Sequence, residues 1–120
     1  MAAATRGKAR PCTPVGYEVV DKGTAVVAMV AGDLLKNSAA GWILLAAGQT
    51  EPDGIALQDF AAGQGGISVG IQGEMDGFSA LVPGTALYPS GAVAGGLDTT
   101  AAGVIRIKAA TTTRIRYSFV

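Results

Sequence analysis

The pattern of apolar and polar residues along this chain predicts short β-strands separated by glycine-containing turns. Residues 67–72 alternate between apolar residues and polar or small ones, which is typical of a strand with one buried face. Residues 24–30 form a continuous apolar run, which favours a strand buried on both faces. Between Gly54 and Leu97 turn residues recur roughly every 8 to 12 positions, and this spacing indicates an all-β barrel or sandwich.

The pattern also predicts a hairpin in the middle of the chain. Asp76 and Gly77 form the dipeptide that most favours a tight two-residue hairpin turn. We therefore expect residues 78–82 to return as the partner of the strand at 67–72.

A second hairpin is predicted at the C-terminal end. Residues 104–108 and 114–120 both alternate, and they are expected to pair across the intervening loop. The core face would then carry Ile105, Ile107, Ile115 and Tyr117, and the opposite face would carry Arg106, Lys108, Arg114 and Arg116. Like charges that face each other across strands cost a few tenths of a kcal/mol to about 1 kcal/mol per pair. An acidic group is therefore expected close to this hairpin.

The charges are divided into blocks along the chain. No lysine or arginine occurs between Asn37 and Ile105, whereas this stretch holds Glu51, Asp53, Asp59, Glu74, Asp76 and Asp98. The formal net charge of +0 is thus a sum of opposed blocks. We expect the basic C-terminal face to contact the acidic middle, with Glu74 and Asp76 as the candidate partners, within one subunit or between neighbouring subunits. Two separately solvated patches are the alternative.

Length and composition narrow the class of protein. A chain of 120 residues is one domain by the usual size range and buries enough surface for a core without disulfides or metals. Charged residues make up 15% of the chain, against roughly 25% in a typical soluble domain. A surface with so few charges is expected to be covered by a partner.

The chain offers little catalytic chemistry. It has 0 histidines and 1 cysteine, so the commonest general base, a cysteine metal cluster and an intrachain disulfide are all missing. The carboxylate pairs Glu51/Asp53 and Glu74/Asp76 lie in predicted turns, where a structural role is favoured over acid/base catalysis. No catalytic, cofactor-binding or metal-ligating residue is predicted, and the chain is not expected to be an enzyme. Zero net charge, with Tyr117 the one aromatic among the cations, also argues against nucleic-acid binding.

Residues 1–16 are predicted to be a flexible N-terminal arm, and residues 17–120 the β domain. The arm carries few apolar residues, so it buries too little surface to offset the entropy of ordering before it binds a partner. Its candidate contact residues are Arg6, Lys8, Arg10, Pro11 and Pro14. A plain disordered tail is the alternative. No apolar stretch approaches the roughly 20 residues that span a bilayer, so a soluble, unexported chain that does not contact a membrane is expected.

The order of strands and turns in the middle of the chain resembles that of tailed-phage capsid cement proteins, also called head decoration proteins. The residues that carry the likeness read Gly-Ile-Ala-Leu at 54–57, Ala-Ala-Gly at 61–63, the alternating strand to Gln72 and Gly73, Pro-Gly-Thr-Ala-Leu-Tyr at 83–88, Gly91, and Gly-Val at 103–104. The resemblance covers roughly residues 15–120. The basic strand at 104–107 departs from the more neutral strand expected of that family.

The resemblance implies a fold and a function. The fold would be a small β-barrel or β-tulip-like domain with a flexible arm. Such proteins bind the outer surface of the matured capsid, usually as homotrimers, and strengthen the shell. The implied partner is the major capsid protein, with no cofactor, and the implied location is the virion surface after synthesis in the host cytoplasm. The arm would add a strand to an exposed edge of the capsid protein.

A second class of function is a small-ligand or carbohydrate-binding β module. It would need exposed aromatic side chains grouped with polar groups in a concavity. Aromatic residues make up only 6% of the chain, which speaks against this alternative. An enzyme of unrecognised type is a third class, which the absence of histidine and of credible catalytic pairs disfavours.

Overall fold

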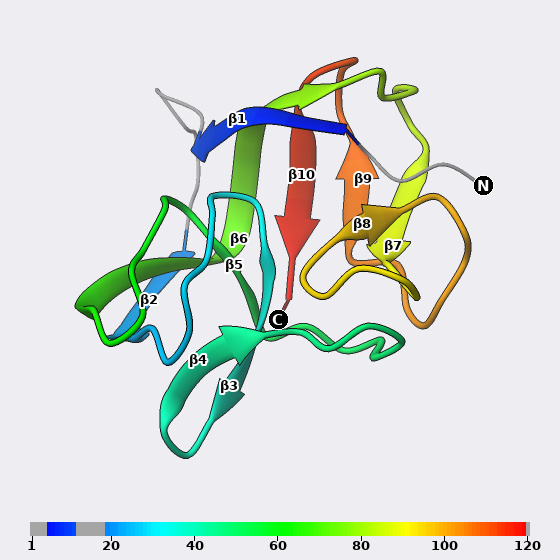
Figure 1. Ribbon diagram of the computed structural model, residues 1–120. Helices are drawn as coiled ribbons and strands as arrows, with labels where there is room; N and C mark the ends of the chain where they lie inside the picture. Colours follow the sequence, from blue (N-terminus) through cyan, green and yellow to red (C-terminus); the bar gives the residue numbers. More distant parts are fainter. Residues whose placement is uncertain (1–4, 12–18, 120) are drawn as a thin grey trace.

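The computed structural model of the protein describes residues 5–11 and 19–119, which form ten β-strands and no helix (Figure 1). The strands are β1 (Thr5–Pro11), β2 (Val19–Thr24), β3 (Leu34–Ser38), β4 (Gly41–Leu44), β5 (Gly54–Ala56), β6 (Gly65–Ser79), β7 (Ala86–Pro89), β8 (Leu97–Asp98), β9 (Ile107–Ala109) and β10 (Ile115–Ser118). The predicted all-β class is confirmed. Within the described residues there is accordingly no helix that is long and apolar enough to cross a membrane.

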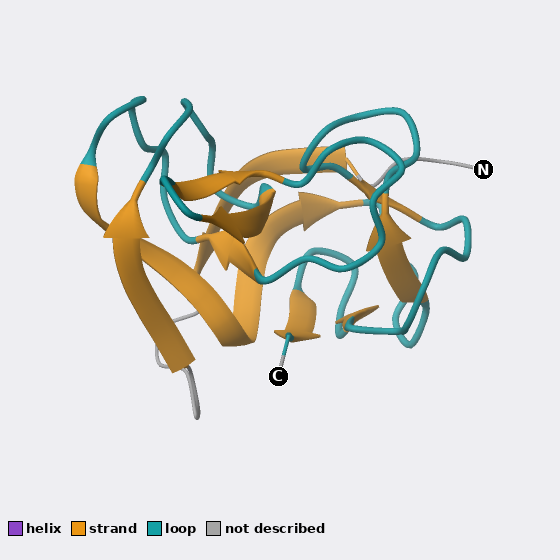
Figure 2. Ribbon diagram, turned by 90° about the horizontal axis from the view of Figure 1, so that it is seen from below, coloured by secondary structure: helices purple, strands orange, loops and turns teal. Residues whose placement is uncertain are grey.

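The strands form one antiparallel sheet that curls on itself. Its main path runs β4-β3-β5-β6-β10-β9-β7-β8, while β1 and β2 both pair with β6 off this path. Figures 1 and 2 show the sheet bending around the interior as a half-barrel. The expectation of a small barrel-like domain agrees with this architecture.

β6 is the strand on which the sheet is built. It is 15 residues long and has neighbours along both of its edges. Gly70 pairs with Val20 of β2 and with Ile55 of β5. Met75 pairs with Pro11 of β1 and with Ile115 of β10. Four strands therefore obtain their main-chain partners from β6.

The predicted hairpin turn at Asp76 and Gly77 is wrong, because β6 continues through both residues to Ser79. Gly77 has a φ of 97°, a conformation that glycine adopts at little cost, and here it lies within a continuous strand instead of a two-residue loop. Arg10 and Arg6 of β1 pair with Asp76 and Phe78 on either side of it. These long-range pairings hold the strand extended where the dipeptide alone favoured reversal.

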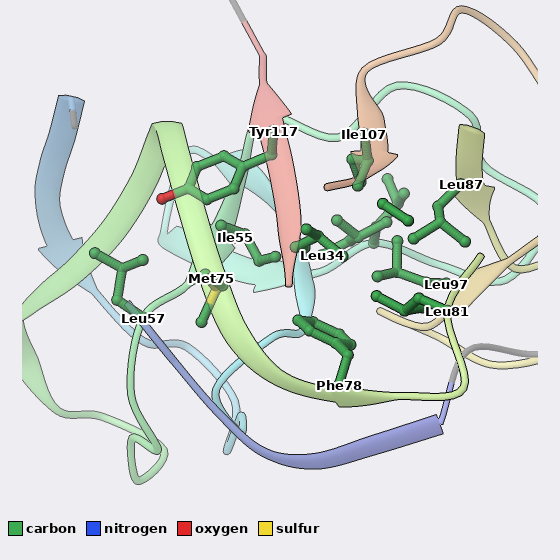
Figure 3. Close-up of a cluster of buried hydrophobic side chains, with 13 residues drawn as sticks. Leu34, Ile55, Leu57, Met75, Phe78, Leu81, Leu87, Leu97, Ile107 and Tyr117 are labelled. Carbon is green, nitrogen blue, oxygen red and sulfur yellow. The ribbon is translucent and has the colours of Figure 1, made fainter. Parts of the chain in front are cut away.

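The interior holds two clusters of buried hydrophobic side chains. The larger one lies between β6, β9, β10 and the loops that cover them (Figure 3), and it contains Leu34, Leu45, Ile55, Leu57, Met75, Phe78, Leu81, Leu87, Leu97, Ile107, Ala109, Ile115 and Tyr117. The smaller one contains Ala25, Met29, Leu35, Trp42, Ala56, Phe60, Ile67 and Val69. The burial of Ile67 and Val69 agrees with the alternation predicted for this strand.

The predicted strand over residues 24–30 is also wrong. β2 ends at Thr24, and beyond it only isolated bridges form, from Ala25 to Trp42 and from Met29 to Phe60. Ala25 and Met29 are buried, whereas Val30, which directly follows the second bridge, is 48% exposed. A continuous apolar run is buried on both faces only when it lies between other elements of the fold. Residues 25–30 form only isolated bridges and no continuous strand pairing.

The C-terminal hairpin is confirmed in its pairing. Ile115 lies opposite Ala109 and Tyr117 lies opposite Ile107, and all these side chains are buried. The expectation that Ile105 shares this core face is wrong, because Ile105 precedes β9 and is 51% exposed. Because β9 begins at Ile107 and not at residue 104 as predicted, Ile105 is not part of the core.

Gly70 provides a test of how closely β6 packs against β10. A β-carbon at this position would contact the hydroxyl of Tyr117 and would lie 2.8 Å from Leu57 Cδ2. Overpacking of this kind costs about 1–3 kcal/mol. Gly70→Ala is therefore expected to lower the free energy of unfolding by about 2 kcal/mol in urea denaturation, and adding Tyr117→Phe is expected to recover part of that loss.

Gly91→Ala is the matched control, since a β-carbon there meets no atom within 4 Å. Its effect should stay within about 0.5 kcal/mol. A double-mutant cycle without coupling between positions 70 and 117 would contradict the proposed contact.

Candidate binding surface

The outward side of β6, β10 and β9 carries a group of charged side chains, which we call the basic face: Glu74, Lys108, Arg114 and Arg116. Arg116 pairs in register with Glu74 of β6 and with Lys108 of β9, so these side chains form a row across three strands. Ile115 and Tyr117 are buried on the inner side. Because side chains alternate along a strand, Arg114 and Arg116 point away from the core.

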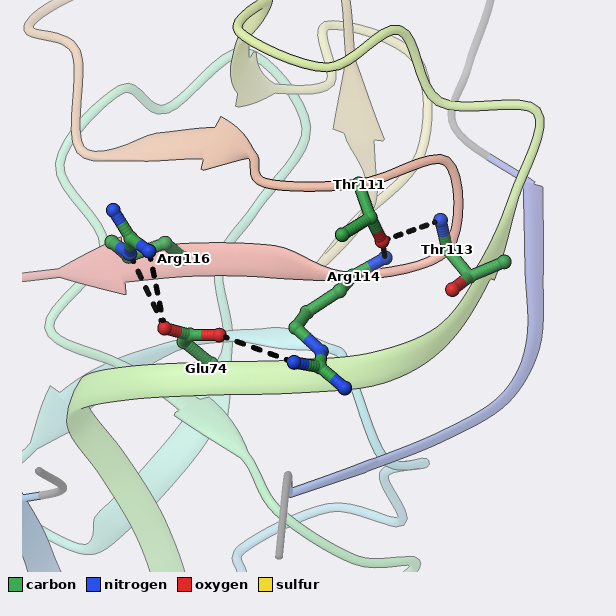
Figure 4. A network of polar contacts seen from close by, with 5 residues as sticks. All are labelled: Glu74, Thr111, Thr113, Arg114 and Arg116. Carbon is green, nitrogen blue, oxygen red and sulfur yellow. Dashed lines mark hydrogen bonds and ion pairs between the residues drawn. The ribbon is translucent and has the colours of Figure 1, made fainter. Parts of the chain in front are cut away.

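Glu74 connects the two arginines of this face (Figure 4). Arg116 donates from Nε and Nη2 to Glu74 Oε2 over 3.3 Å each. Arg114 Nη1 lies 3.8 Å from Glu74 Oε1. The side chain of Arg116 is 69% exposed and that of Arg114 43%, so water screens both ion pairs. The predicted contact between the basic hairpin and Glu74 is thus made inside one chain.

Lys108 adds positive charge to this row without a carboxylate of its own. It is exposed and lies opposite Arg116. Among the described residues, no acidic side chain lies within ion-pair distance of Lys108. Two adjacent cations on neighbouring strands repel each other. The basic face therefore keeps an attraction for an anionic group beyond Glu74.

The loop between β9 and β10 holds Arg114 in place. Thr111 Oγ1 accepts hydrogen bonds from the backbone N–H groups of Thr113 at 3.2 Å and Arg114 at 3.0 Å. The backbone N–H of Ala110 donates to the carbonyl of Arg114 over 2.8 Å. This role of Thr111 was not anticipated, although a run of three threonines before the strand is a signal for such a hydroxyl-capped turn.

β1 pairs with the edge of β6 opposite to β10, so it lies beside the strand that carries Glu74 of the basic face. Arg10 pairs with Asp76 and Arg6 pairs with Phe78, with an irregular register between Arg6 and Arg10, where Lys8 lies. Pro11 pairs with Met75. Part of the predicted arm is therefore a strand of the domain's own sheet, and Pro14 lies outside the described residues.

The remaining predicted contact residues lie at the border of this surface. Arg106 precedes β9, is half-buried and accepts a hydrogen bond on its carbonyl from the N–H of Ser118. Asp76 is half-buried on β6, one alternation beyond Glu74 towards β1. The structure thus brings Glu74, Arg114 and Arg116 into contact and places Lys108, Arg106 and Asp76 around them.

A separate hollow lies next to β7 and β8. It has a volume of about 380 Å³ and is lined by Pro89, Gly91, Ala92, Asp98, Thr100 and Ala102. The carboxylate of Asp98 accepts the backbone N–H of Thr99 at 2.6 Å and that of Thr100 at 3.2 Å, so it holds the loop that follows β8. No aromatic side chain lines this hollow.

The described residues include no group of three or more His, Cys, Asp or Glu side chains that could hold a metal ion. Comparisons with protein-family models, curated proteins and solved structures found no match for this chain.

Replacing Glu74 tests whether it neutralises the basic face. Glu74→Gln leaves Arg114, Arg116 and Lys108 without this carboxylate, and we expect the free energy of unfolding to fall by about 0.5–1 kcal/mol at low salt. The loss should shrink in 1 M salt, where the Debye length is about 3 Å. Chemical denaturation at both salt concentrations measures it.

The matched control is Glu51→Gln, because the Glu51 side chain is exposed and forms no ion pair with the described residues. An equal, salt-independent change in both variants would contradict a specific role for Glu74.

Proposed function

We propose that this protein is a tailed-phage capsid decoration protein, a structural protein that binds the outer surface of the mature head as a trimer and stabilises the shell. Its partner would be the major capsid protein, and its place would be the virion surface after synthesis in the host cytoplasm. The proposal starts from the resemblance over roughly residues 15–120. The observation that carries it further is the position of β1 at a sheet edge beside the basic face.

β1 is suited to strand addition because no described strand pairs with its second edge. Among the described strands it pairs only with β6, so its other edge keeps main-chain donors and acceptors available. An edge strand of the capsid protein would extend the sheet there through main-chain hydrogen bonds that need no particular side chains. Arg6, Lys8 and Arg10 lie in this strand, next to a face that already carries excess positive charge.

Trimeric attachment would turn a weak contact into a durable one. After the first subunit has bound, the other two are held close to their own sites, which raises their effective concentration there. A small domain with few charged groups can therefore clamp a shell without a large interface per subunit. This mechanism needs no catalytic residue and no cofactor.

The alternative is a small-ligand or carbohydrate-binding module, and the hollow next to β7 and β8 is the observation that would favour it. Its volume of about 380 Å³ falls in the range of ligand pockets, roughly 300–1,000 Å³. Sugar binding, however, relies on exposed aromatic faces, and Trp42, Phe60 and Phe78 are buried in the two cores. The decoration role is therefore preferred.

Co-sedimentation with expanded, DNA-free heads of the source virus tests the proposal. The full-length protein is expected to pellet with the heads. Two variants should lose affinity at least about tenfold, equivalent to about 1.4 kcal/mol: the triple Arg6→Gln, Lys8→Gln and Arg10→Gln, and the double Arg114→Glu and Arg116→Glu. The circular dichroism spectrum of each variant will show whether the β-sheet is retained.

Lys22→Gln serves as the control for loss of a cation elsewhere on the surface, since Lys22 is an exposed cation of β2 whose side chain donates a hydrogen bond to Ser68. Full-length protein that stays in the supernatant while it retains a glycan from an array would favour the ligand-binding alternative. If the triple variant bound the heads as fully as the unaltered protein, the cations of β1 would have no role in the contact.

A further inference from the structure

A buried carboxylate lies in the wall of the hollow next to β7 and β8. Asp98 is 5% exposed and is one of the residues that line this hollow of about 380 Å³. In Figure 1 the gold loop before β8 and the orange loop after it supply most of the lining. Apart from Thr100, the other lining residues have no polar side chain: they are Pro89, Gly91, Ala92 and Ala102. The hollow is therefore a largely apolar space with one carboxylate in its wall.

The two oxygens of the Asp98 carboxylate have different surroundings. Oδ1 accepts the backbone N–H of Thr99 at 2.6 Å and that of Thr100 at 3.2 Å. Oδ2 forms no hydrogen bond or ion pair with the described part of the chain. It is not sealed from solvent either, because among the described side-chain atoms it is Arg114 Nε that is buried without a hydrogen-bond partner. Oδ2 is therefore accessible from the hollow that Asp98 lines.

No cation of the described residues is paired with this carboxylate. The ion pairs among them join Lys36 to Asp53 and two arginines to Glu74, and none includes Asp98. The loops that build the hollow contain no lysine or arginine that could supply one. A buried charge in a protein is ordinarily paired or bound to a metal ion. A hard metal ion needs several oxygen ligands, and the described residues hold no group of acidic side chains for one.

The wall on the β7 side of the hollow is held in place by hydrogen bonds of Ser90, which is 2% exposed. Its Oγ accepts the backbone N–H of Ala92 at 3.1 Å and that of Val93 at 3.0 Å. Its own N–H donates to the carbonyl of Gly96 over 3.0 Å. This wall is therefore formed before any ligand binds, which lowers the entropy that binding would cost.

We propose that this hollow binds a primary ammonium group carried on a short apolar stem. The ammonium would donate a charge-assisted hydrogen bond to Oδ2 of Asp98 and supply the positive charge that the loops lack. The stem would contact Pro89, Ala92 and Ala102, so that its apolar surface is removed from water. The volume of about 380 Å³ lies within the roughly 300–1,000 Å³ of ligand pockets.

The geometry of Asp98 favours an ammonium over a guanidinium. A guanidinium pairs best with both oxygens of a carboxylate at once, through two parallel hydrogen bonds. Oδ1 of Asp98 already accepts two backbone N–H groups, so a single oxygen is left for a ligand. An ammonium is a compact charge that can use one oxygen. A free alkylamine and the lysine side chain of another protein share this chemistry.

Titration of the full-length protein with n-butylammonium chloride tests the proposal. Two-dimensional proton–nitrogen NMR follows the N–H signals of Thr99 and Thr100, which are bonded to Asp98 and are expected to shift in a saturable way. n-Butanol has the same stem without the charge and should bind at least tenfold more weakly, and equal sodium chloride should cause no saturable shift. Nα-acetyl-lysine methylamide carries the same ammonium on a peptide unit. Tighter binding of this compound than of n-butylammonium would indicate a lysine as the natural ligand, and weaker binding a free amine.

Asp98→Asn removes the charge and keeps an oxygen that can accept the two N–H groups. It should raise the dissociation constant of n-butylammonium at least tenfold and leave that of n-butanol unchanged. The matched control is Asp59→Asn, because Asp59 is exposed, accepts the N–H of Ala31 at 2.9 Å and does not line the hollow. Its affinity for n-butylammonium should equal that of the unaltered protein.

Three results would overturn the inference: no saturable shift with n-butylammonium, equal binding of n-butanol, or an unchanged affinity in a folded Asp98→Asn variant. If that variant does not fold, as its thermal transition will show, the comparison of n-butylammonium with n-butanol on the unaltered protein decides. The test needs no capsid and does not involve β1 or the basic face. Its failure would therefore leave the decoration role as it stands, and failure of that role would leave the ammonium site.

Discussion

The pairing of β6 along both of its edges is the constraint on which the rest of this structure depends. A strand of 15 residues exposes more main-chain donors and acceptors than one neighbour of ordinary length can pair, and here four strands share them. β2 and β1 follow each other along one edge, and β5 and β10 along the other. Because the strand bends as it passes between them, the sheet closes around the larger core and becomes a half-barrel (Figure 2).

The same strand connects the core to the surface chemistry. On its inner side Met75 and Phe78 pack in the larger cluster, while on its outer side Glu74 lies between Arg114, which precedes β10, and Arg116 of β10. The alternation of β6 thus places the carboxylate of Glu74 within reach of cations that would otherwise repel one another. β1, paired with the last third of the strand, ends up beside this charged row. The proposed contact with a capsid and the stability of the sheet consequently depend on one element.

The two proposed binding sites use opposite charges. The basic face and the second edge of β1 offer cations and main-chain hydrogen bonds, which suit a partner of different composition. The hollow next to β7 and β8 offers the carboxylate of Asp98 among small apolar residues, which suits one positive charge on an apolar stem. The net charge is +0, yet the basic face carries three cations and one carboxylate, so it keeps a local positive charge.

Local patterns in the sequence determined the all-β class, the buried alternation at Ile67 and Val69, and the pairing of the two C-terminal strands, because each depends on neighbours within a few residues or on one short loop. They also predicted that Glu74 would meet the basic hairpin. Only the tertiary structure decided the rest. Asp76 and Gly77 favour a turn in isolation, yet pairing with β1, more than sixty positions earlier in the chain, keeps them in a strand. The burial of Asp98 was likewise decided by the loops that pack around it, because no local signal in the sequence distinguishes a buried aspartate from an exposed one.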